Sequence, residues 1–274
     1  MAALTLRELA GKLDVSVATV SRALAGDTAI ALKTRQRVAE AAQQYGYVAN
    51  VAARQLVSGR SGFAGFVMPV RGPNFIDSYL GEFVTGLGEG FVENGLDLFI
   101  ATAQPSRSEL SVLRHVVESG RADGIVVPRI GETDERVHYL IERKFPFVAH
   151  GRLLDSTVPY SWLDSDSVHA FGEAFDMLYE LGHRHFGLVS ISDAMTFRHM
   201  RERGLREAMA RRGDPNVTLD VVTAPRFDRG ATVAAINSLI HRSKRPTAIL
   251  GLFDELALTV MEEVPHFALA WLGM

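Results

Sequence analysis

The spacing of hydrophobic residues differs between the first 46 residues of this chain of 274 and the part that begins at Phe63. Over its first 46 residues, apolar side chains recur every three or four positions, and this spacing predicts three short helices. From Phe63 onward, near-continuous apolar runs alternate with amphipathic segments. That alternation is typical of parallel strands that are buried on both faces and joined by helices. We therefore expect a small helical head followed by a larger α/β body.

Capping residues mark the helices of the head. Residues 5–8 (TLRE) have the pattern of a capping box, and Ser16 is placed to cap a second helix that ends at Gly26. A third helix is expected from about residue 32 to residue 44, with Gly46 after it. The segment after residue 50, VAARQLVSGRSG, begins with a short helical pattern and ends in residues rich in Gly and Ser, so we interpret it as a hinge.

The body is expected to form two similar lobes, with the chain crossing between them near Tyr160. The apolar runs predict strands at 63–68, 98–101, 124–127, 147–149, 185–191, 219–222 and 248–252. Helices are expected at about 79–94, 107–119, 134–143, 167–181, 199–212 and 229–242.

The second helix of the head has two contrasting faces. Val20, Ala23 and Leu24 share one face, which is expected to pack on the first helix. Small apolar, hydroxyl and guanidinium groups on the other face suit a DNA major groove, where methyl-sized side chains contact thymine methyls and Ser and Arg bind phosphates and bases. Periodicity alone also allows a three-helix packing unit without a ligand. The outward residues are Val17, Ala18, Ser21 and Arg22.

Composition and charge exclude some classes of function for this protein and favour others. The chain is 47% hydrophobic and 22% charged, and it has no cysteine, which excludes disulfides, cysteine metal ligands and thiol catalysis. The first 60 residues hold eight Lys or Arg against four Asp or Glu, whereas the remainder holds 21 against 28. A basic head on an acidic body suits nucleic-acid binding by the head. No apolar run is long enough to span a membrane and no signal peptide is recognisable, so we expect a cytoplasmic protein without a membrane partner.

Several motifs resemble a known family when they are taken together. They are Thr5-Leu6, Leu9-Ala10, DVSVATVSRAL, Lys33-Thr34-Arg35 with Val38, Tyr45-Gly46-Tyr47 and NVAARQL, and in this order they resemble the head of the LacI/GalR family of bacterial transcriptional repressors. The likeness continues through SGFAGFVMP, RADGIVV, FPFVAHGR, LYELGHRHFGLVS and RPTAIL…DELAL. It implies a helix-turn-helix DNA-binding domain at 1–48, a hinge helix and linker at 49–60, and an effector-binding and dimerisation domain at 61–274, with lobes at about 61–159 and 160–274.

The resemblance also implies roles for residues of the head and hinge. Val17 and Ala18, with Arg22, are expected to read bases. Leu56 is expected to wedge between base steps, and Ala53 to let two hinge helices approach closely. The ordinary alternative for Leu56 is packing between domains. The full expected DNA-binding set is Thr5, Ser16, Val17, Ala18, Thr19, Ser21, Arg22, Thr34, Asn50, Ala53 and Leu56.

The body resembles sugar-binding periplasmic proteins, so the implied fold is an all-α head on two Rossmann-like parallel-sheet lobes of periplasmic-binding-protein type. A small-molecule effector, expected to be a carbohydrate, would bind between the lobes at the carboxyl ends of the strands. Carboxylate, Asn and Arg groups there would bind hydroxyls, and an aromatic ring would stack on a sugar face. The expected ligand-binding set is Asn74, Phe75, Asp77, His150, Arg152, Asp166, Arg201, Phe253 and Asp254.

The chain departs from the family pattern at three places. Ala31 stands where the family usually has Ser or Thr, which should cost about 1 kcal/mol of helix capping. Phe253 replaces the Asn that commonly precedes Asp254. The chain ends at VPHFALAWLGM, where relatives continue, so we expect an incomplete second lobe that exposes a sheet edge and an apolar face.

No motif assembles a catalytic centre. The Gly-rich run TGLGEG falls within an expected helix, His183 and His185 are expected to point to opposite sides, and no nucleophile accompanies a base. No cofactor, metal or enzymatic activity is therefore expected. The leading hypothesis is a homodimeric, ligand-controlled repressor that binds a double-stranded DNA operator. A sugar-binding sensing or transport module and an α/β enzyme are the alternatives.

Overall fold

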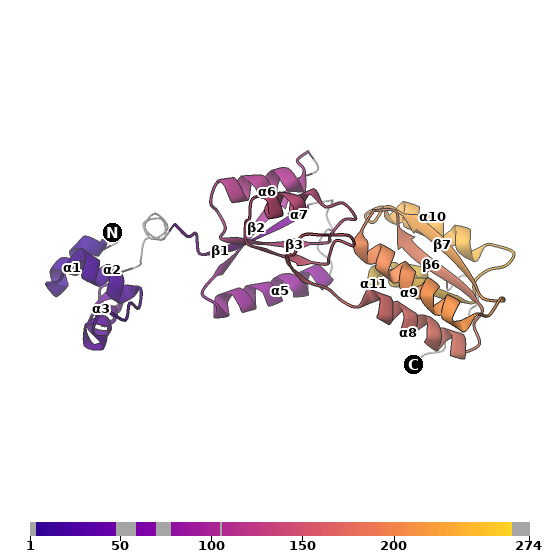
Figure 1. Ribbon diagram of the computed structural model, residues 1–274, viewed down its shortest axis with the longest axis horizontal. Helices are drawn as coiled ribbons and strands as arrows, with labels where there is room; N and C mark the ends of the chain where they lie inside the picture. The colour runs from indigo at the N-terminus through magenta and orange to yellow at the C-terminus, as the bar shows by residue number, and fades with distance from the viewer. Residues whose placement is uncertain (1–3, 48–58, 70–77, 105, 265–274) are drawn as a thin grey trace. The chain divides into compact units, whose positions relative to one another are not determined.

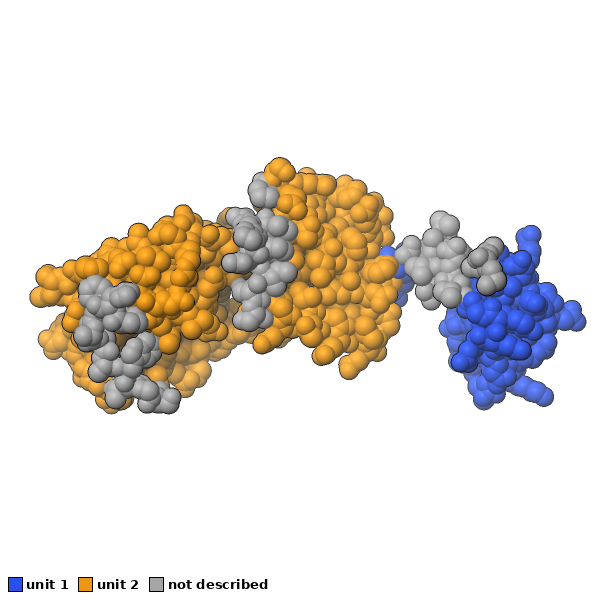
Figure 2. Space-filling model, turned by 180° about the vertical axis from the view of Figure 1, so that it is seen from behind, with its two compact units in different colours: residues 1–61 blue, residues 62–274 orange. Residues whose placement is uncertain are grey.

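The computed structural model describes residues 4–47, 59–69, 78–104 and 106–264. The chain divides into two compact units, Met1–Ser61 and Gly62–Met274, which have separate colours in Figure 2. We call them the head and the body.

Three helices form the head, and local capping decides where they begin. They are α1 (Leu6–Leu13), α2 (Val17–Leu24) and α3 (Leu32–Gln44). Thr5 and Glu8 close the expected capping box, and the Oγ of Ser16 accepts from the amide of Thr19 at 3.0 Å. Ala31 precedes α3 without any side-chain cap, as expected from its methyl group. The core of the head consists of Leu9, Ala10, Leu13, Val20, Ala23, Val38, Ala41 and Ala42.

The first lobe of the body is a parallel five-stranded sheet in the order β2-β1-β3-β4-β5. Its strands are β1 (Phe63–Pro69), β2 (Asp97–Ala103), β3 (Gly124–Pro128), β4 (Phe147–His150) and β5 (Ser161–Leu163). Helix α5 (Ser78–Glu93) lies on one face, and α6 (Glu109–Glu118) and α7 (Glu135–Glu142) lie on the other (Figure 1). Each face of this sheet has its own apolar core, and successive residues of β3 point into opposite ones. Val126 packs toward α5, whereas Ile125 and Val127 pack toward α6 and α7.

The second lobe repeats this arrangement around a smaller parallel sheet in the order β7-β6-β8. Its strands are β6 (His185–Ile191), β7 (Thr218–Ala224) and β8 (Ala248–Gly251). Helices α8 (Ser167–Glu180) and α9 (Thr196–Arg212) cover one face, where Phe175, Phe186 and Leu205 are buried. Helices α10 (Arg229–Ile240) and α11 (Asp254–Glu263) cover the other.

The expected fold class is confirmed, with three corrections to the elements. Helix α11 was not among the helices expected from the apolar pattern. Strand β5 was not predicted, because its three residues are all exposed and form no apolar run. It pairs with β4, so the chain leaves the first lobe after Leu163 rather than near Tyr160. Helix α9 begins at Thr196, three residues before its expected start. In the part of the chain that the structure describes, no helix could cross a membrane.

Candidate DNA interface and effector site

The outward face of α2 is as the helical spacing predicts. Val20 and Ala23 are buried against the neighbouring helices, and Leu24 is partly buried beside them. Val17 is 41% exposed, and Ala18, Ser21 and Arg22 are exposed as well. This face therefore presents two apolar side chains, one hydroxyl and one guanidinium to solvent.

Arg22 is held in place by a residue that the sequence analysis did not single out. Its Nε donates to Oδ2 of Asp27 at 2.7 Å, and Oδ1 of Asp27 accepts from the amide of Ala29 at 2.9 Å. The backbone hydrogen bond from Ala29 and the side-chain hydrogen bond from Arg22 lower the pKa of Asp27. The carboxylate is therefore ionised at neutral pH and orients the guanidinium.

The other expected DNA contacts on described residues are hydroxyl groups with local roles. Thr5 donates from its amide and its hydroxyl to Glu8 Oε2, each at 2.8 Å. The hydroxyls of Ser16 and Thr19 lie 2.8 Å apart, and Thr34 is half-buried in the first turn of α3. The groups of Thr5, Ser16 and Thr19 therefore stabilise the first turns of α1 and α2. Asn50, Ala53 and Leu56 lie outside the described residues.

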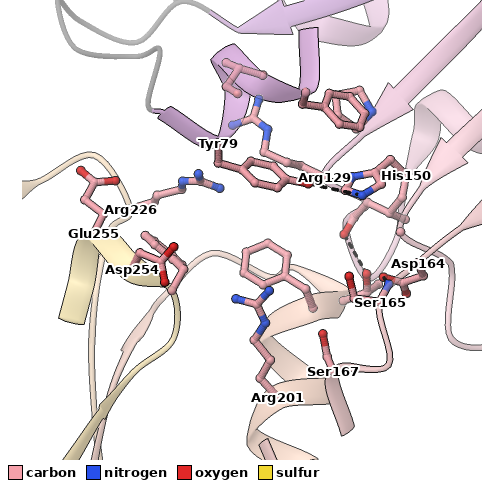
Figure 3. A pocket seen from close by; sticks show the side chains of 18 of the residues that line it. Tyr79, Arg129, His150, Asp164, Ser165, Ser167, Arg201, Arg226, Asp254 and Glu255 are labelled. Carbon is pink, nitrogen blue, oxygen red and sulfur yellow. Dashed lines mark hydrogen bonds between the residues drawn. The ribbon is translucent and has the colours of Figure 1, made fainter. Parts of the chain in front are cut away.

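A pocket of about 290 Å³ opens between the two lobes of the body (Figure 3). It lies at the carboxyl ends of the parallel strands, because Arg129, His150 and Phe253 follow or end β3, β4 and β8. Helices α5, α9 and α11 contribute further side chains. Its polar lining includes Tyr79, Arg129, His150, Asp164, Ser165, Ser167, Thr196, Arg201, Arg226, Asp254 and Glu255, and its rings are Phe83, Phe197, Phe227 and Phe253.

An aromatic wall from the first lobe forms one side of this pocket. The hydroxyl of Tyr79 lies 3.3 Å from Nε2 of His150, and the ring of Phe83 lies 4.7 Å from the imidazole. Burial lowers the pKa of His150, although the charge of Asp164 opposes that shift. The imidazole is therefore neutral at pH 7. It has one nitrogen that can donate a hydrogen bond and one that can accept a hydrogen bond.

Arg201 reaches the pocket from α9. One of its Nη groups donates to the carbonyl oxygen of Leu252, and its guanidinium carbon lies 5.5 Å from the Phe171 ring and 5.1 Å from the Phe197 ring. Burial lowers the pKa of Arg201, while electrostatic interactions with Tyr79, Asp254 and Asp164 oppose that shift and the like charge of Arg226 adds to it. A guanidinium stays charged under these conditions, so the site places a desolvated cation beside aromatic faces.

The head and the body both resemble known proteins. Residues 5–50 match the family model of bacterial regulatory proteins of the lacI family, and residues 175–268 match the periplasmic binding protein-like domain. The HTH-type transcriptional regulator AglR of Rhizobium meliloti is 32% identical over 265 residues, which are 97% of this chain and 74% of AglR. The chain belongs to the LacI family. It is thus a transcriptional regulator with a helix-turn-helix head and not an enzyme.

Other relatives agree with this LacI-family assignment. RafR of Escherichia coli is 29% identical over 90% of this chain and 72% of its own length. CelR of Thermobifida fusca is also 29% identical, over 94% of this chain and 76% of its own length. A lac repressor dimer bound to operator and an anti-inducer shares the fold, with a TM-score of 0.78 and 17% identity over 97% of this chain and 78% of that chain.

Two of the expected ligand residues of this LacI-family protein lie outside the lining of the pocket. Asp166 is exposed, and its carboxylate accepts from the amide of His169 at 3.0 Å as the cap of α8. Asp164 lines the pocket instead, because it directly follows the end of β5. Arg152 also lies outside the lining, with its Nε 3.8 Å from Asp164 Oδ2 and its guanidinium carbon 4.9 Å from the Trp162 ring.

The remaining expected ligand residues divide into two groups. His150, Arg201, Phe253 and Asp254 line the pocket together. Asn74, Phe75 and Asp77 lie outside the described residues. Tyr79, Arg129 and Arg226 also line the pocket and were not predicted. Arg129 directly follows β3 and Arg226 comes two residues after β7, and this position after a strand end is the signal that could have indicated these two arginines.

A buried ion-pair network supports the loop that carries Arg129. Arg129 has a φ of 51°, a left-handed conformation that is uncommon for residues other than glycine. Buried Arg136 donates from Nη2 to the carbonyl oxygens of Pro128 and Arg129, each at 3.0 Å, and to Oδ2 of Asp134 at 2.7 Å. Its Nη1 lies 2.5 Å from Oε2 of Glu109. These bonds hold the uncommon backbone conformation at the rim of the pocket.

The same loop joins the two lobes through backbone hydrogen bonds. The amide and the hydroxyl of Thr196 both donate to the carbonyl oxygen of Ile130, at 3.0 Å and 3.1 Å. The amide of Glu132 donates to the carbonyl oxygen of Ala194 at 3.0 Å, and Gly131 pairs with Met195 in an isolated antiparallel bridge. The separation of the lobes at this point is therefore coupled to the start of α9.

Proposed function

We propose that this regulator represses transcription by binding an operator through α2, and that a carbohydrate in the pocket between the lobes controls that binding. The DNA-binding part of this proposal is based on the side chains on the outward face of α2. Val17 and Ala18 can approach thymine methyls, while Arg22 can form a two-pronged contact with a guanine. Ser16, Thr19, Ser21 and Thr34 are proposed to position the phosphate backbone, with Thr5 at the start of α1.

A carbohydrate effector is proposed from the chemistry of the pocket. Arg201, Asp254 and His150 offer donors and acceptors for adjacent hydroxyls, and the rings of Phe197 and Phe253 offer apolar faces for a sugar ring. One solved structure with 24% identity and a TM-score of 0.64 is a complex of the transcriptional regulator CelR with cellobiose. That ligand belongs to CelR, and it supports a saccharide as the class to test here.

The proposed switch joins these two sites. Residues 1–48 would bind DNA, 49–60 would form a hinge, and 61–274 would bind effector and a second copy of the chain. Two heads of a homodimer would contact two half-sites of a near-palindromic operator. An effector that binds open and closed lobes with different affinity would change the population of the DNA-binding state. A protein that binds chromosomal DNA would act in the cytoplasm.

Selection of duplexes from a random library by the full chain tests this proposal. We expect a near-palindromic consensus, and we expect Ala18→Gln to change the preferred base at one position of each half-site because Gln can pair with adenine. Ala39→Gln, on an exposed position of α3, is the matched control and should select the wild-type consensus. A folded wild-type chain that selects no duplex over random competitor would overturn the proposal.

A further inference from the structure

Helix α9 begins without a side-chain cap of its own. Met195 precedes it in an extended conformation, and in the described part of the chain no side chain at that position accepts a hydrogen bond from the first turn. The helix starts with TFRH, which contains no acidic residue to favour the positive end of the helix dipole. By contrast, α6, α7, α8 and α10 each start after a Ser or Asp whose oxygen accepts a backbone amide. The sequence next to α9 therefore provides no side-chain acceptor for its free amides.

The acceptor comes from the first lobe. The carbonyl oxygen of Ile130, in the loop after β3, accepts from the amide of Thr196 at 3.0 Å and from its hydroxyl at 3.1 Å. Ile130 and Thr196 are each 1% exposed, so water cannot replace these bonds while the lobes stay together. Just before the helix, the carbonyl oxygen of Ala194 accepts from the amide of Glu132 at 3.0 Å. A loop of the first lobe thus caps a helix of the second.

A buried ion pair fixes the direction of the Ile130 carbonyl. The amide of Gly131 belongs to the same planar peptide group as that carbonyl, and it donates to Oδ2 of Asp134 at 3.0 Å. Nη2 of Arg136 donates to Oδ2 of Asp134 at 2.7 Å and to the carbonyl oxygen of Arg129 at 3.0 Å. Asp134 and Arg136 are both buried, and both belong to the first lobe. The acceptor is therefore held in place independently of α9.

The start of α9 also forms part of the pocket between the lobes. Thr196, Phe197 and Arg201 line this pocket together with Ile130 from the capping loop. Figure 3 shows Arg201 directed into the pocket from α9, across from Tyr79 of the first lobe. When the lobes separate, the first turn of α9 loses its acceptor, and a helix end without a cap frays. Separation of the lobes would therefore disorder the wall that carries Phe197.

We propose that closure of the lobes caps α9, and that Thr196 is thereby a positioning residue for the effector site. In the closed form, the first turn of α9 is ordered and holds Phe197 and Arg201 at the pocket. In the open form, that turn frays and the wall is incomplete. An effector that contacts α9 then binds the closed form preferentially, because only that form presents the complete wall. This regulatory consequence rests on the proposed effector site, whereas the capping relation does not.

Hydrogen–deuterium exchange of the full chain, without DNA or ligand, tests the capping relation. Thr196→Val keeps the shape but loses the hydroxyl bond, so amides in the first turn of α9 should exchange about fivefold faster. Thr196→Ser keeps the hydroxyl and should exchange like the wild type. The first turn of α8, which the adjacent Asp166 caps, is the internal control and should not change. Wild-type exchange in a folded Thr196→Val chain, or equal acceleration in Thr196→Ser, would overturn the inference.

Two further changes distinguish capping between the lobes from a local effect. Arg136→Met alters only the first lobe, yet it should speed exchange in the first turn of α9 by about threefold, because the Ile130 carbonyl is no longer held. Met195→Ser should give α9 its own cap and remove the effect of both Thr196→Val and Arg136→Met. Met195→Ala removes the same packing without adding an acceptor, so as the matched control it should leave both effects.

Two outcomes of this second set would contradict capping by the other lobe. One is wild-type exchange at α9 in a folded Arg136→Met chain, and the other is equal rescue by Met195→Ala and Met195→Ser. The measurements involve neither an operator nor a sugar. Failure of the capping relation therefore leaves the proposed DNA-binding and effector functions standing, and failure of those functions leaves the capping relation standing.

Discussion

Nε of Arg22 and Oδ2 of Asp27 lie 2.7 Å apart, across the turn that follows the helix proposed to enter the major groove. Both side chains are substantially exposed, so this ion pair contributes little to stability. Its effect is to limit the rotamers of Arg22. The pair therefore connects a residue outside α2 with the proposed reading of DNA sequence.

We expect Asp27→Asn to weaken discrimination between duplexes rather than folding. Arg22→Ala should lose about tenfold in preference for the selected duplex over one changed at the contacted base pair. Asp27→Asn should lose less, because the guanidinium remains but is less firmly oriented. Competition binding with the two duplexes measures the ratio, and a melting curve checks the fold. Identical ratios for Asp27→Asn and wild type would show that Asp27 does not position Arg22.

Ala31→Ser should stabilise the head. Ala31 has an extended ψ of 139° and provides no side-chain hydrogen bond at the start of α3. A serine hydroxyl there can accept from the amide of Thr34, which should add about 1 kcal/mol to the free energy of unfolding. Ala39→Ser, in the exposed middle of the same helix, should be neutral or slightly destabilising. Denaturant unfolding monitored by helical circular dichroism compares the two, and a loss of stability in Ala31→Ser would contradict the capping argument.

Arg136→Met should destabilise the first lobe in a pH-dependent way. Burial raises the pKa of Asp134, but the hydrogen bond and charge of Arg136 and the amides of Gly131 and Arg136 outweigh it, so the pKa lies below its ordinary value. In the wild type, the contribution of Asp134 is present above the unfolded-state pKa and is lost as pH falls through the lower folded-state pKa. Without the guanidinium, the buried carboxylate loses its counter-charge, which should cost about 3–5 kcal/mol at pH 7.

The pH profile distinguishes this mechanism from a simple packing defect. The pKa of Asp134 should rise in Arg136→Met, so the deficit relative to wild type should shrink as pH falls and protonation removes the unpaired charge. The double variant Asp134→Asn with Arg136→Met should be more stable at pH 7 than Arg136→Met alone. A deficit that stays constant from pH 7 to pH 4 would indicate packing as the cause.

Gly204→Ala should destabilise the second lobe, because α8 and α9 are in close backbone contact there. A Cβ on Gly204 would lie 2.3 Å from the carbonyl oxygen of Val168. Backbone atoms can relieve that overlap only by moving the helices apart, so we expect a cost of about 1–3 kcal/mol. A Cβ at Gly230, in the first turn of α10, would lie 3.5 Å from Oδ1 of Asp228, so Gly230→Ala should be neutral or stabilising. Thermal unfolding of both variants provides the comparison.

Thr196→Val should loosen the contact between the lobes without removing its volume. The variant keeps the backbone hydrogen bond to Ile130 but lacks the hydroxyl bond of 3.1 Å. We expect a loss of about 1 kcal/mol in unfolding free energy. Small-angle scattering of the body should also report a more open average separation of the lobes. Unchanged scattering together with unchanged stability would mean that this bond does not influence closure.

Local patterns in the sequence were sufficient for most of the secondary structure. The capping box at Thr5, the cap at Ser16 and the uncapped start at Ala31 depend on groups within three or four residues of one another. The buried strands were recognisable because their apolar runs are continuous. Strand β5 was not, since its three residues are exposed and its pairing with β4 is a contact between distant segments.

For the DNA interface and the pocket, too, local patterns predicted some features and contacts between distant segments decided the others. The sequence by itself determined the outward face of α2 and the family resemblance, because helical spacing and short motifs are local properties that survive in the linear order. Only the tertiary structure decided that Asp164 rather than Asp166 lines the pocket, that Asp27 holds Arg22, and that Arg201 and Arg226 point into one cavity. Those relationships depend on turns, on strand register and on the packing of two lobes, which bring together side chains that no local pattern connects.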